Sequence, residues 1–250
     1  MNTGQKTIEK LTADLQASQR EIEIEKALER VRTRALAMQE SGEIMGVATA
    51  MRNAFEDLGY PMYRVRIVFY DIPAGTLTSW VAQPPTPREQ DFLRVSPRKL
   101  DRRLKTYKNW QKSEPSWFEV TDKAAHSRLL RKLSAQDGWS AARLRKQIAA
   151  APDPLFDMYI RIDGGYVCFG SAMAFTEADV DVASRFVNVF EIAFRRFEEL
   201  QLKEAQNRAL QVEGALERVR SRSLAMVGTN ELPRSEERRG GKECRSRWSP

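Results

Sequence analysis

The stretch that decides the architecture is ALERVRTRALAM, residues 27–38, because ALERVRSRSLAM follows at residues 215–226. Ten of the twelve positions are identical, and the second stretch begins 188 residues after the first. This distance is several times the period of a solenoid repeat. It indicates a helix, one complete domain, and then the same helix again. We call residues 27–38 copy 1 and residues 215–226 copy 2.

Both copies have apolar residues at alternating spacings of four and three, which is the a/d pattern of a helix that pairs with another helix. A surface helix that packs on its own domain would show a similar row. Because one core does not require the same residues twice, the repetition favours a dimerisation and signalling helix. The pattern leaves parallel and antiparallel pairing open. The residues of this predicted seam are Leu28, Val31, Ala35 and Met38 in copy 1, and Leu216, Val219 and Met226 in copy 2.

After copy 1, the chain predicts a helix and then a hairpin. Residues 43–58 have helical apolar spacing, and Gly59 ends the helix. Residues 63–71 and 76–82 alternate as strands, with a turn at residues 72–75 between them.

Before copy 2, the chain predicts another hairpin and another helix. Residues 155–162 alternate as a strand, residues 166–175 form its partner, and Gly164 and Gly165 make the tight turn between them. Thr176 caps the helix that follows. The order of elements predicts an α+β domain with an antiparallel sheet. Helices cover one face, and a helical insertion covers the other face and closes a pocket. Long coiled-coil helices flank this domain.

This arrangement resembles the GAF-like sensor units of bacterial signalling proteins that carry an ALERVR-x-R-x-LAM helix. Residues 175–206, FTEADVDVASRFVNVFEIAFRRFEELQLKEAQ, are similar to the exit helix of those units, which leads into the next copy. The resemblance covers about residues 20–230, and it is specific in the helices and limited to layout between them. It implies a GAF-like sheet, a homodimer and a place upstream of a histidine kinase, cyclase or transcription output domain.

The resulting division has four parts. These are an N-terminal signalling helix at residues 1–42, a GAF-like sensor domain at 43–190, a C-terminal signalling helix at 191–233 and a tail at 234–250. The tail resembles the in-frame translation of a common sequencing adapter, which predicts that the natural protein continues past Pro233. The tail holds six Lys or Arg and three Glu, so the net charge of +7 falls to +4 without it.

Composition and motifs favour a protein without catalytic activity. No run of about 18 apolar residues is present to span a membrane, and the N-terminus lacks the apolar stretch of a signal peptide, which predicts a cytoplasmic location. Cys168, Cys244 and His126 suggest no disulfide framework or metal centre. No phosphate-binding loop, zinc-protease or serine-hydrolase motif occurs. No catalytic residue and no metal ligand is predicted, and the cofactor stays unknown.

The segment at residues 84–150 is strongly basic, with sixteen Lys or Arg against seven Asp or Glu, and it is rich in aromatic residues. This segment has three possible interpretations. It is a lid for a small anionic or aromatic ligand, a patch that binds nucleic acid, or a helical insertion with buried tryptophans and solvated lysines. Strand alternation places one set of side chains under this lid, if the apolar set faces the helices. The predicted ligand-binding residues are Arg64, Arg66, Trp80, Trp117, Tyr159 and Arg161.

Three functions remain open at this point. The first is a sensory and dimerising module that relays a ligand-dependent bias through its helices. The second is the N-terminal fragment of a sensor histidine kinase or cyclase in a two-component system. The third, through the basic insertion, is nucleic-acid binding.

Overall fold

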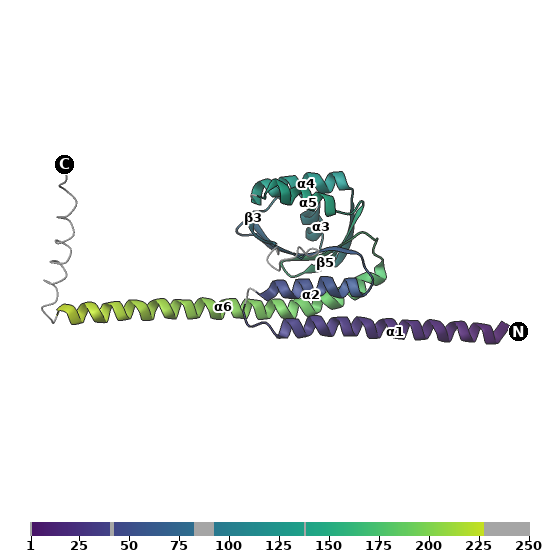
Figure 1. Ribbon diagram of the computed structural model, residues 1–250, viewed down its shortest axis with the longest axis horizontal. Coiled ribbons are helices and arrows are strands. Elements are labelled where there is room, and N and C mark those ends of the chain that lie inside the picture. Colours follow the sequence, from purple (N-terminus) through teal and green to yellow (C-terminus); the bar gives the residue numbers. More distant parts are fainter. Residues whose placement is uncertain (1, 41–42, 83–92, 138, 228–250) are drawn as a thin grey trace, which may run out of the picture. The chain divides into compact units, whose positions relative to one another are not determined.

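The computed structural model describes residues 2–40, 43–82, 93–137 and 139–227 (Figure 1). The adapter-like tail and Cys244 therefore lie outside the described residues. The chain forms two units, Met1–Glu198 and Glu199–Pro250. The first unit contains a six-stranded sheet with helices on both faces, so the predicted α+β class is confirmed.

The sheet is antiparallel throughout, with strand order β3-β2-β1-β6-β5-β4. Its two central strands, β1 and β6, come from the two predicted hairpins. The strands are β1 (Met62–Asp71), β2 (Thr76–Ala82), β3 (Leu93–Lys99), β4 (Ser116–Thr121), β5 (Leu155–Ile162) and β6 (Gly165–Ser171).

Both predicted hairpins are confirmed, and glycine makes each turn possible. Gly75 between β1 and β2 has φ +63°, and Gly164 between β5 and β6 has φ +70°. These left-handed conformations suit a residue without a Cβ atom. At Gly165, a Cβ would lie only 1.8 Å from the carbonyl oxygen of Val68. The close approach of β6 to β1 therefore requires glycine there.

The insertion is not purely helical, which corrects the prediction. It supplies both edge strands of the sheet, β3 and β4, in addition to three short helices. Pro97 lies in β3, which is consistent with an edge position because proline cannot donate a ladder hydrogen bond. The helices are α3 (Lys105–Gln111), α4 (Lys123–Asp137) and α5 (Ala141–Ala150), and they lie on one side of the sheet (Figure 1).

On the other side lies the helix layer, which we define as α2 (Ile44–Asp57) and residues 177–198 of α6 (Glu177–Val227). Phe55 of α2 is fully buried, and its ring lies 4.6 Å from that of Phe169 on β6 and 5.0 Å from that of Phe186 on α6. These rings join the two helices to the sheet. As predicted, α2 ends before Gly59, whose φ is +90°.

Residues 27–36 of copy 1 lie in α1 (Asn2–Leu36), which packs on the helix layer. Ala37 and Met38 follow the end of this helix, so the predicted helix of copy 1 is two residues shorter than expected. Of its seam, Val31 and Met38 are fully buried, and Leu28 and Ala35 are at most 3% exposed. Glu21 and Glu25 of α1 both pair with Arg185 of α6. The alternative in which this helix packs on its own domain is therefore the arrangement found for copy 1.

Copy 2 differs from copy 1 in its surroundings. It lies in α6 within the second unit, and Leu216 and Val219 are 55% and 61% exposed. Met226 lies in the last turn of α6, and its side chain is outside the described part. None of the described helices combines the length and apolar character needed to cross a bilayer.

Candidate functional site

The insertion covers what we call the inner face of the sheet, and alternation along β1 decides which residues reach it. Phe69 stacks on Phe194 of the helix layer, with ring centroids 4.1 Å apart. Arg64 and Arg66 point the opposite way, toward the inner face, and contact residues of β5 and β6 there. The register between β5 and β6 places Tyr159 beside Cys168 on this face.

A buried ion pair crosses the inner face. Nη2 of Arg64 on β1 lies 2.8 Å and 3.1 Å from the two carboxylate oxygens of Asp157 on β5. Gly170 of β6 lies between them in the ladder, and a Cβ there would lie 2.8 Å from Oδ1 of Asp157 and 2.9 Å from Cγ of Arg64. The missing side chain therefore makes room for the pair. Both partners are at most 7% exposed.

Two further groups donate toward Asp157. Sγ of Cys168 lies 3.3 Å from its Oδ1, and Oη of Tyr159 lies 3.5 Å from its Oδ2. Burial, followed by the adjacent Asp157 carboxylate, raises the pKa of the Cys168 thiol to about 12. Burial likewise raises the pKa of Tyr159. Cys168 is therefore a neutral thiol, which is poorly suited to nucleophilic attack.

Beside this pair lies an aromatic cluster that includes several residues of the predicted site. Trp117 of β4 stacks on Tyr159 of β5, with ring centroids 4.8 Å apart and planes inclined by 5°. Nη2 of Arg66 donates to the hydroxyl of Tyr166 at 2.9 Å. The buried members of the cluster are Val68, Trp117, Tyr159, Tyr166 and Cys168.

Helix α3 closes one side of the cluster. Trp110 packs against Tyr70 of β1, with ring centroids 4.8 Å apart. Arg161 of β5 donates a hydrogen bond to the carbonyl of Trp110, and its guanidinium carbon lies 5.0 Å from the centroid of that indole. Five of the six predicted residues thus reach the inner face. They are Arg64, Arg66, Trp117, Tyr159 and Arg161.

Trp80 is the exception, and its predicted placement is corrected. It pairs with Ile67 in the β1–β2 register, so its side chain lies on the side of the helix layer. Its ring centroid lies 6.0 Å from that of Phe197 and 6.3 Å from that of Phe194. Trp80 therefore belongs to the core between sheet and helices.

Several nitrogen atoms that face the insertion side are buried without a hydrogen-bond partner among the described residues. A buried donor without a partner is costly, and native interiors contain few of them. Water or a ligand with acceptor oxygens would satisfy such atoms. They are Nε of Arg64, Nε of Arg66, Nε1 of Trp110, Nε1 of Trp117 and Nε2 of His126.

His126 of α4 lies over this region and is 1% exposed. Its ring meets that of Tyr63 edge-on, with centroids 5.8 Å apart. Burial, followed by the nearby Arg64 guanidinium, lowers the pKa of His126 to about 4. The imidazole is therefore neutral at neutral pH.

This burial predicts acid sensitivity. The unfolded chain takes up a proton on His126 below about pH 6.5, and the folded chain does so only near pH 4. The free energy of unfolding should therefore fall by about 3 kcal/mol as the pH drops from 7 to 4. In His126→Phe, which keeps an aromatic ring beside Tyr63, this loss should be absent in denaturant titrations. Parallel pH profiles of the two proteins would contradict the prediction.

Sequence reasoning did not single out Asp157, Tyr166 or Gly170. Asp157 could have been found, because it alternates with Tyr159 and Arg161 in LFDMYIRI and is the only acidic residue of that strand. Among the described residues, no group of three or more His, Cys, Asp or Glu is placed to hold a metal ion. The inner face is suited instead to binding through hydrogen bonds, positive charge and aromatic stacking.

No family model and no curated protein sequence matches the chain. Among solved structures, it is similar to a phycocyanobilin-bound GAF domain from a cyanobacterial phytochrome, with 12% identity, a TM-score of 0.40, and 72% of this chain and 96% of that chain covered. It is also similar to a phycoerythrobilin-bound GAF domain from a cyanobacterial phytochrome (12%, TM-score 0.42, 74% and 99% covered). A third is a methyl-accepting chemotaxis protein (16%, TM-score 0.42, 70% and 99% covered).

Proposed function

We propose that this chain is a non-catalytic, GAF-like sensory module that binds a small anionic ligand against the inner face of its sheet. The observation that carries the proposal is the set of buried, unpartnered nitrogen atoms beneath the insertion. All five can act as hydrogen-bond donors, His126 in one of its tautomers, and two belong to arginines. Carboxylate or phosphate oxygens would accept from such groups, and guanidinium groups bind both anions well.

The charges of the inner face support an anion. Asp157 neutralises Arg64, but no ion pair within the described part of the chain includes Arg66. Arg98 of β3 belongs to the same face through its register with Leu77. Burial lowers the pKa of Arg98, and so does the nearby guanidinium of Arg66. A bound anion between these two guanidinium groups would offset the positive charge that lowers the pKa of Arg98.

The aromatic groups support a ligand with a flat part. Trp110 and Trp117 each have a buried indole N–H without a hydrogen-bond partner among the described residues. An indole ring offers apolar area beside its single donor. A nucleotide, which combines a phosphate with a planar base, would use both kinds of group. The protonated Cys168 and the neutral His126 are consistent with binding rather than covalent chemistry.

We propose that the sheet transmits the effect of ligand binding from the inner face to the helices. β1 carries Arg66 on the inner face and Phe69 on the helix side, where Phe69 stacks on Phe194 of α6. A ligand shifts such a system only through different affinities for its two states. We propose that movement of β1 on binding biases α6. The output domain that would receive this bias, such as a histidine kinase or cyclase, and a cytoplasmic location remain predictions from the sequence.

Ligand binding is tested with inorganic phosphate and with a nucleoside monophosphate. Either probe, at about 100 times its Kd, should raise the free energy of unfolding by about 2.7 kcal/mol. Arg66→Gln, which removes the unpaired charge, should weaken binding by roughly tenfold to a hundredfold in calorimetric titrations. The matched control is Arg145→Gln on the exposed side of α5, which should bind as the parent does. Equal affinities of both variants would contradict the proposal.

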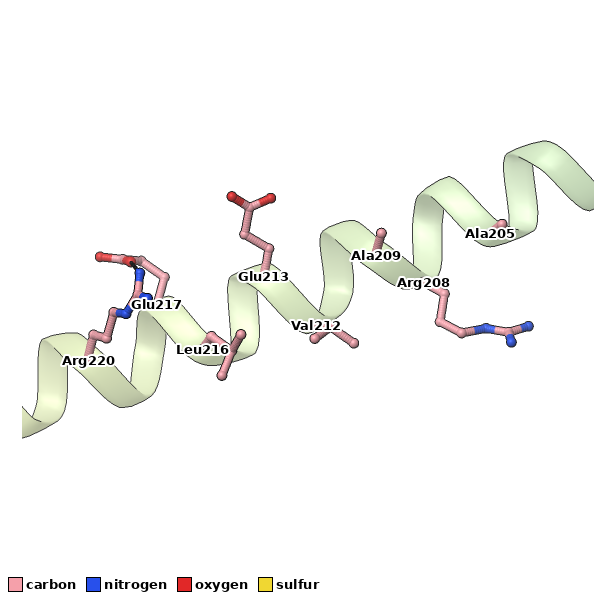
Figure 2. Close-up of a pocket in the computed structure, with 8 residues that line it drawn as sticks. All are labelled: Ala205, Arg208, Ala209, Val212, Glu213, Leu216, Glu217 and Arg220. Atoms are coloured by element: carbon pink, nitrogen blue, oxygen red, sulfur yellow. Dashed lines mark ion pairs between the residues drawn. The ribbon is translucent and has the colours of Figure 1, made fainter.

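We also propose a homodimer through the helices, with copy 2 as its surface. The copy 1 seam is already covered within the first unit, whereas Leu216 and Val219 of the copy 2 seam are exposed. Figure 2 shows the two apolar side chains Val212 and Leu216 on one side of α6, and Glu213 on the other. The apolar row continues to Val219, so it spans about two turns of helix with no cover in the described chain.

The dimer is tested with Val219→Asp. A carboxylate in an apolar helix interface should convert the dimer to a monomer, because burial of an unpaired charge is strongly unfavourable. Sedimentation equilibrium measures this change. The control is Leu210→Asp, which puts the same charge on a different side of the same helix, where Leu210 is 65% exposed. A parent chain that is monomeric at all concentrations would exclude the dimer.

A further inference from the structure

The helix layer binds copy 1 through contacts that can be named one by one. Leu28, Val31 and Met38 supply the buried apolar groups. Arg30 pairs with Asp57 at the end of α2, with 2.6 Å between Nη2 and Oδ2. Arg34 lies against Gly46 of α2, where a Cβ would come within 2.6 Å of its Nε.

Two more contacts fix the ends of this segment, one within α1 and one just after it. Before copy 1, Glu25 pairs with Arg185 of α6. At its end, the carbonyl of Met38 accepts a hydrogen bond from Nε of Arg196, also on α6, at 3.0 Å. Copy 1 is thus held by apolar burial in the middle and by charged or polar contacts along its length.

Copy 2 carries the same groups at the same spacing. Leu216, Val219 and Met226 correspond to the buried residues Leu28, Val31 and Met38. The charged residues also have counterparts in order. Glu213 corresponds to Glu25, Arg218 to Arg30 and Arg222 to Arg34.

Within the described part of the chain, the apolar residues at and before copy 2 are largely exposed. Leu216 and Val219 are more than half exposed, and Val212, the counterpart of the buried Ile24, is 56% exposed. In Figure 2, apolar Val212 and Leu216 lie on the same side of α6 as charged Arg208, and Glu213 and Glu217 lie on the other side. The surface is therefore apolar in the middle and charged at its margins, as copy 1 is.

We propose that copy 2 of one chain binds the helix layer of a second copy of this chain, at the site that copy 1 occupies. This inference rests on the proposed dimer and names the surface that copy 2 uses on its partner. The two copies are then competing ligands for one site. Exchange of equivalent elements between protomers is a low-cost route to dimers, because the incoming helix restores the interactions that the departing helix made.

The sequence differences between the copies favour binding of copy 1 at this site. Ala35 is buried, and its counterpart Ser223 would bring a hydroxyl into the apolar seam. Glu21, which pairs with Arg185, is replaced by Ala209. Copy 1 is therefore the stronger ligand and holds the site in part of the population, while the partner's copy 2 holds it in the dimer. Copy 2 of the partner takes the site when α1 is withdrawn, which couples the state of α1 to assembly.

The decisive experiment disables each copy in the full-length chain. Val31→Asp removes copy 1 from its site, and Val219→Asp removes copy 2. With Val31→Asp alone, the partner's copy 2 should replace copy 1. The melting temperature of this variant should then rise with protein concentration over about 1 to 100 μM, because folding is linked to association. With both substitutions, the melting temperature should be lower and independent of concentration.

A cross-linking measurement reports the docked register directly. In a Cys244→Ser background, Asp57→Cys and Arg218→Cys are combined and treated with a short bismaleimide, while the buried Cys168 stays in place. Covalent dimers should form, and they should increase when Val31→Asp is added. The matched pair Arg30→Cys and Asp57→Cys, whose parent side chains form an ion pair within one chain, should give an internal cross-link.

The outcomes separate this inference from the dimer on which it rests. If Val31→Asp melts like the double variant at every concentration, copy 2 does not use the site and the inference is wrong. If Val219→Asp still dissociates the dimer in that case, the proposed dimer stands with another contact surface. If Val219→Asp leaves the oligomeric state unchanged, the proposed dimer is wrong as well.

Discussion

Replacing Asp157 with asparagine should lower the free energy of unfolding by about 3–5 kcal/mol, which is typical for a buried ion pair that loses one partner. Arg64 would keep its charge in a site where it is 7% exposed, with no carboxylate to balance it. The same change should weaken the hydrogen bond from Cys168. Denaturant titration at neutral pH measures the loss.

Two further variants test whether that loss comes from the buried ion pair. Asp163→Asn, in the exposed turn between β5 and β6, makes the same chemical change and should alter the free energy of unfolding by less than about 0.5 kcal/mol. The double variant Arg64→Met with Asp157→Leu should recover most of the loss, because an apolar pair of similar volume carries no desolvation penalty. If Asp157→Asn were no worse than Asp163→Asn, the ion pair would not be buried as described.

Replacing Phe55 with alanine should cost about 3–5 kcal/mol, because a fully buried aromatic side chain leaves a cavity behind. The ring joins α2 to β6 and α6 through Phe169 and Phe186, so the loss should extend across the helix layer. Thermal or denaturant unfolding detects it.

The matched control for this second variant is Phe118→Ala. Phe118 lies on the edge strand β4 and is 39% exposed, so its truncation should cost less than about 1 kcal/mol. Equal losses in the two variants would mean that the helix layer is not joined to the sheet through Phe55.

Strand alternation predicted the inner face well where the strands were long and regular. Arg64 and Arg66 of β1, and Tyr159 and Arg161 of β5, lie where the period of two places them. Trp80 was misplaced because its face depends on the register of the hairpin, which the turn determines. The pairing of Asp71 with Thr76 puts Trp80 opposite Ile67 and therefore among the helices.

The edge strands of the insertion were missed for a different reason. β4 has only six residues and β3 contains Pro97, so neither has a strong local strand signal. Pairing with the long central hairpins stabilises them, and that pairing is a tertiary effect outside any local pattern. The buried pair of Arg64 and Asp157 is likewise formed by residues 93 positions apart.

The two copies show the limit of pattern reading most clearly. Copy 1 and copy 2 have the same apolar row apart from Ser223 in place of Ala35, yet Val31 is fully buried and Val219 is 61% exposed. A row of apolar residues predicts that a helix has a partner, but it does not say which partner. For copy 1 the partner is the helix layer of the same unit. Copy 2 has a similar pattern, but its apolar residues Leu216 and Val219 are exposed.

The spacing of the copies also has a genetic consequence. The two stretches begin 188 residues apart and share ten of twelve amino acids, so an exchange between them would preserve the sequence of the helix. Such an event would delete or duplicate one whole domain in frame and would rejoin the helix without a shift in its heptads. Since either copy carries the groups that cover a helix layer, the products could fold. Modules of this kind can therefore change in number during evolution while each junction stays intact.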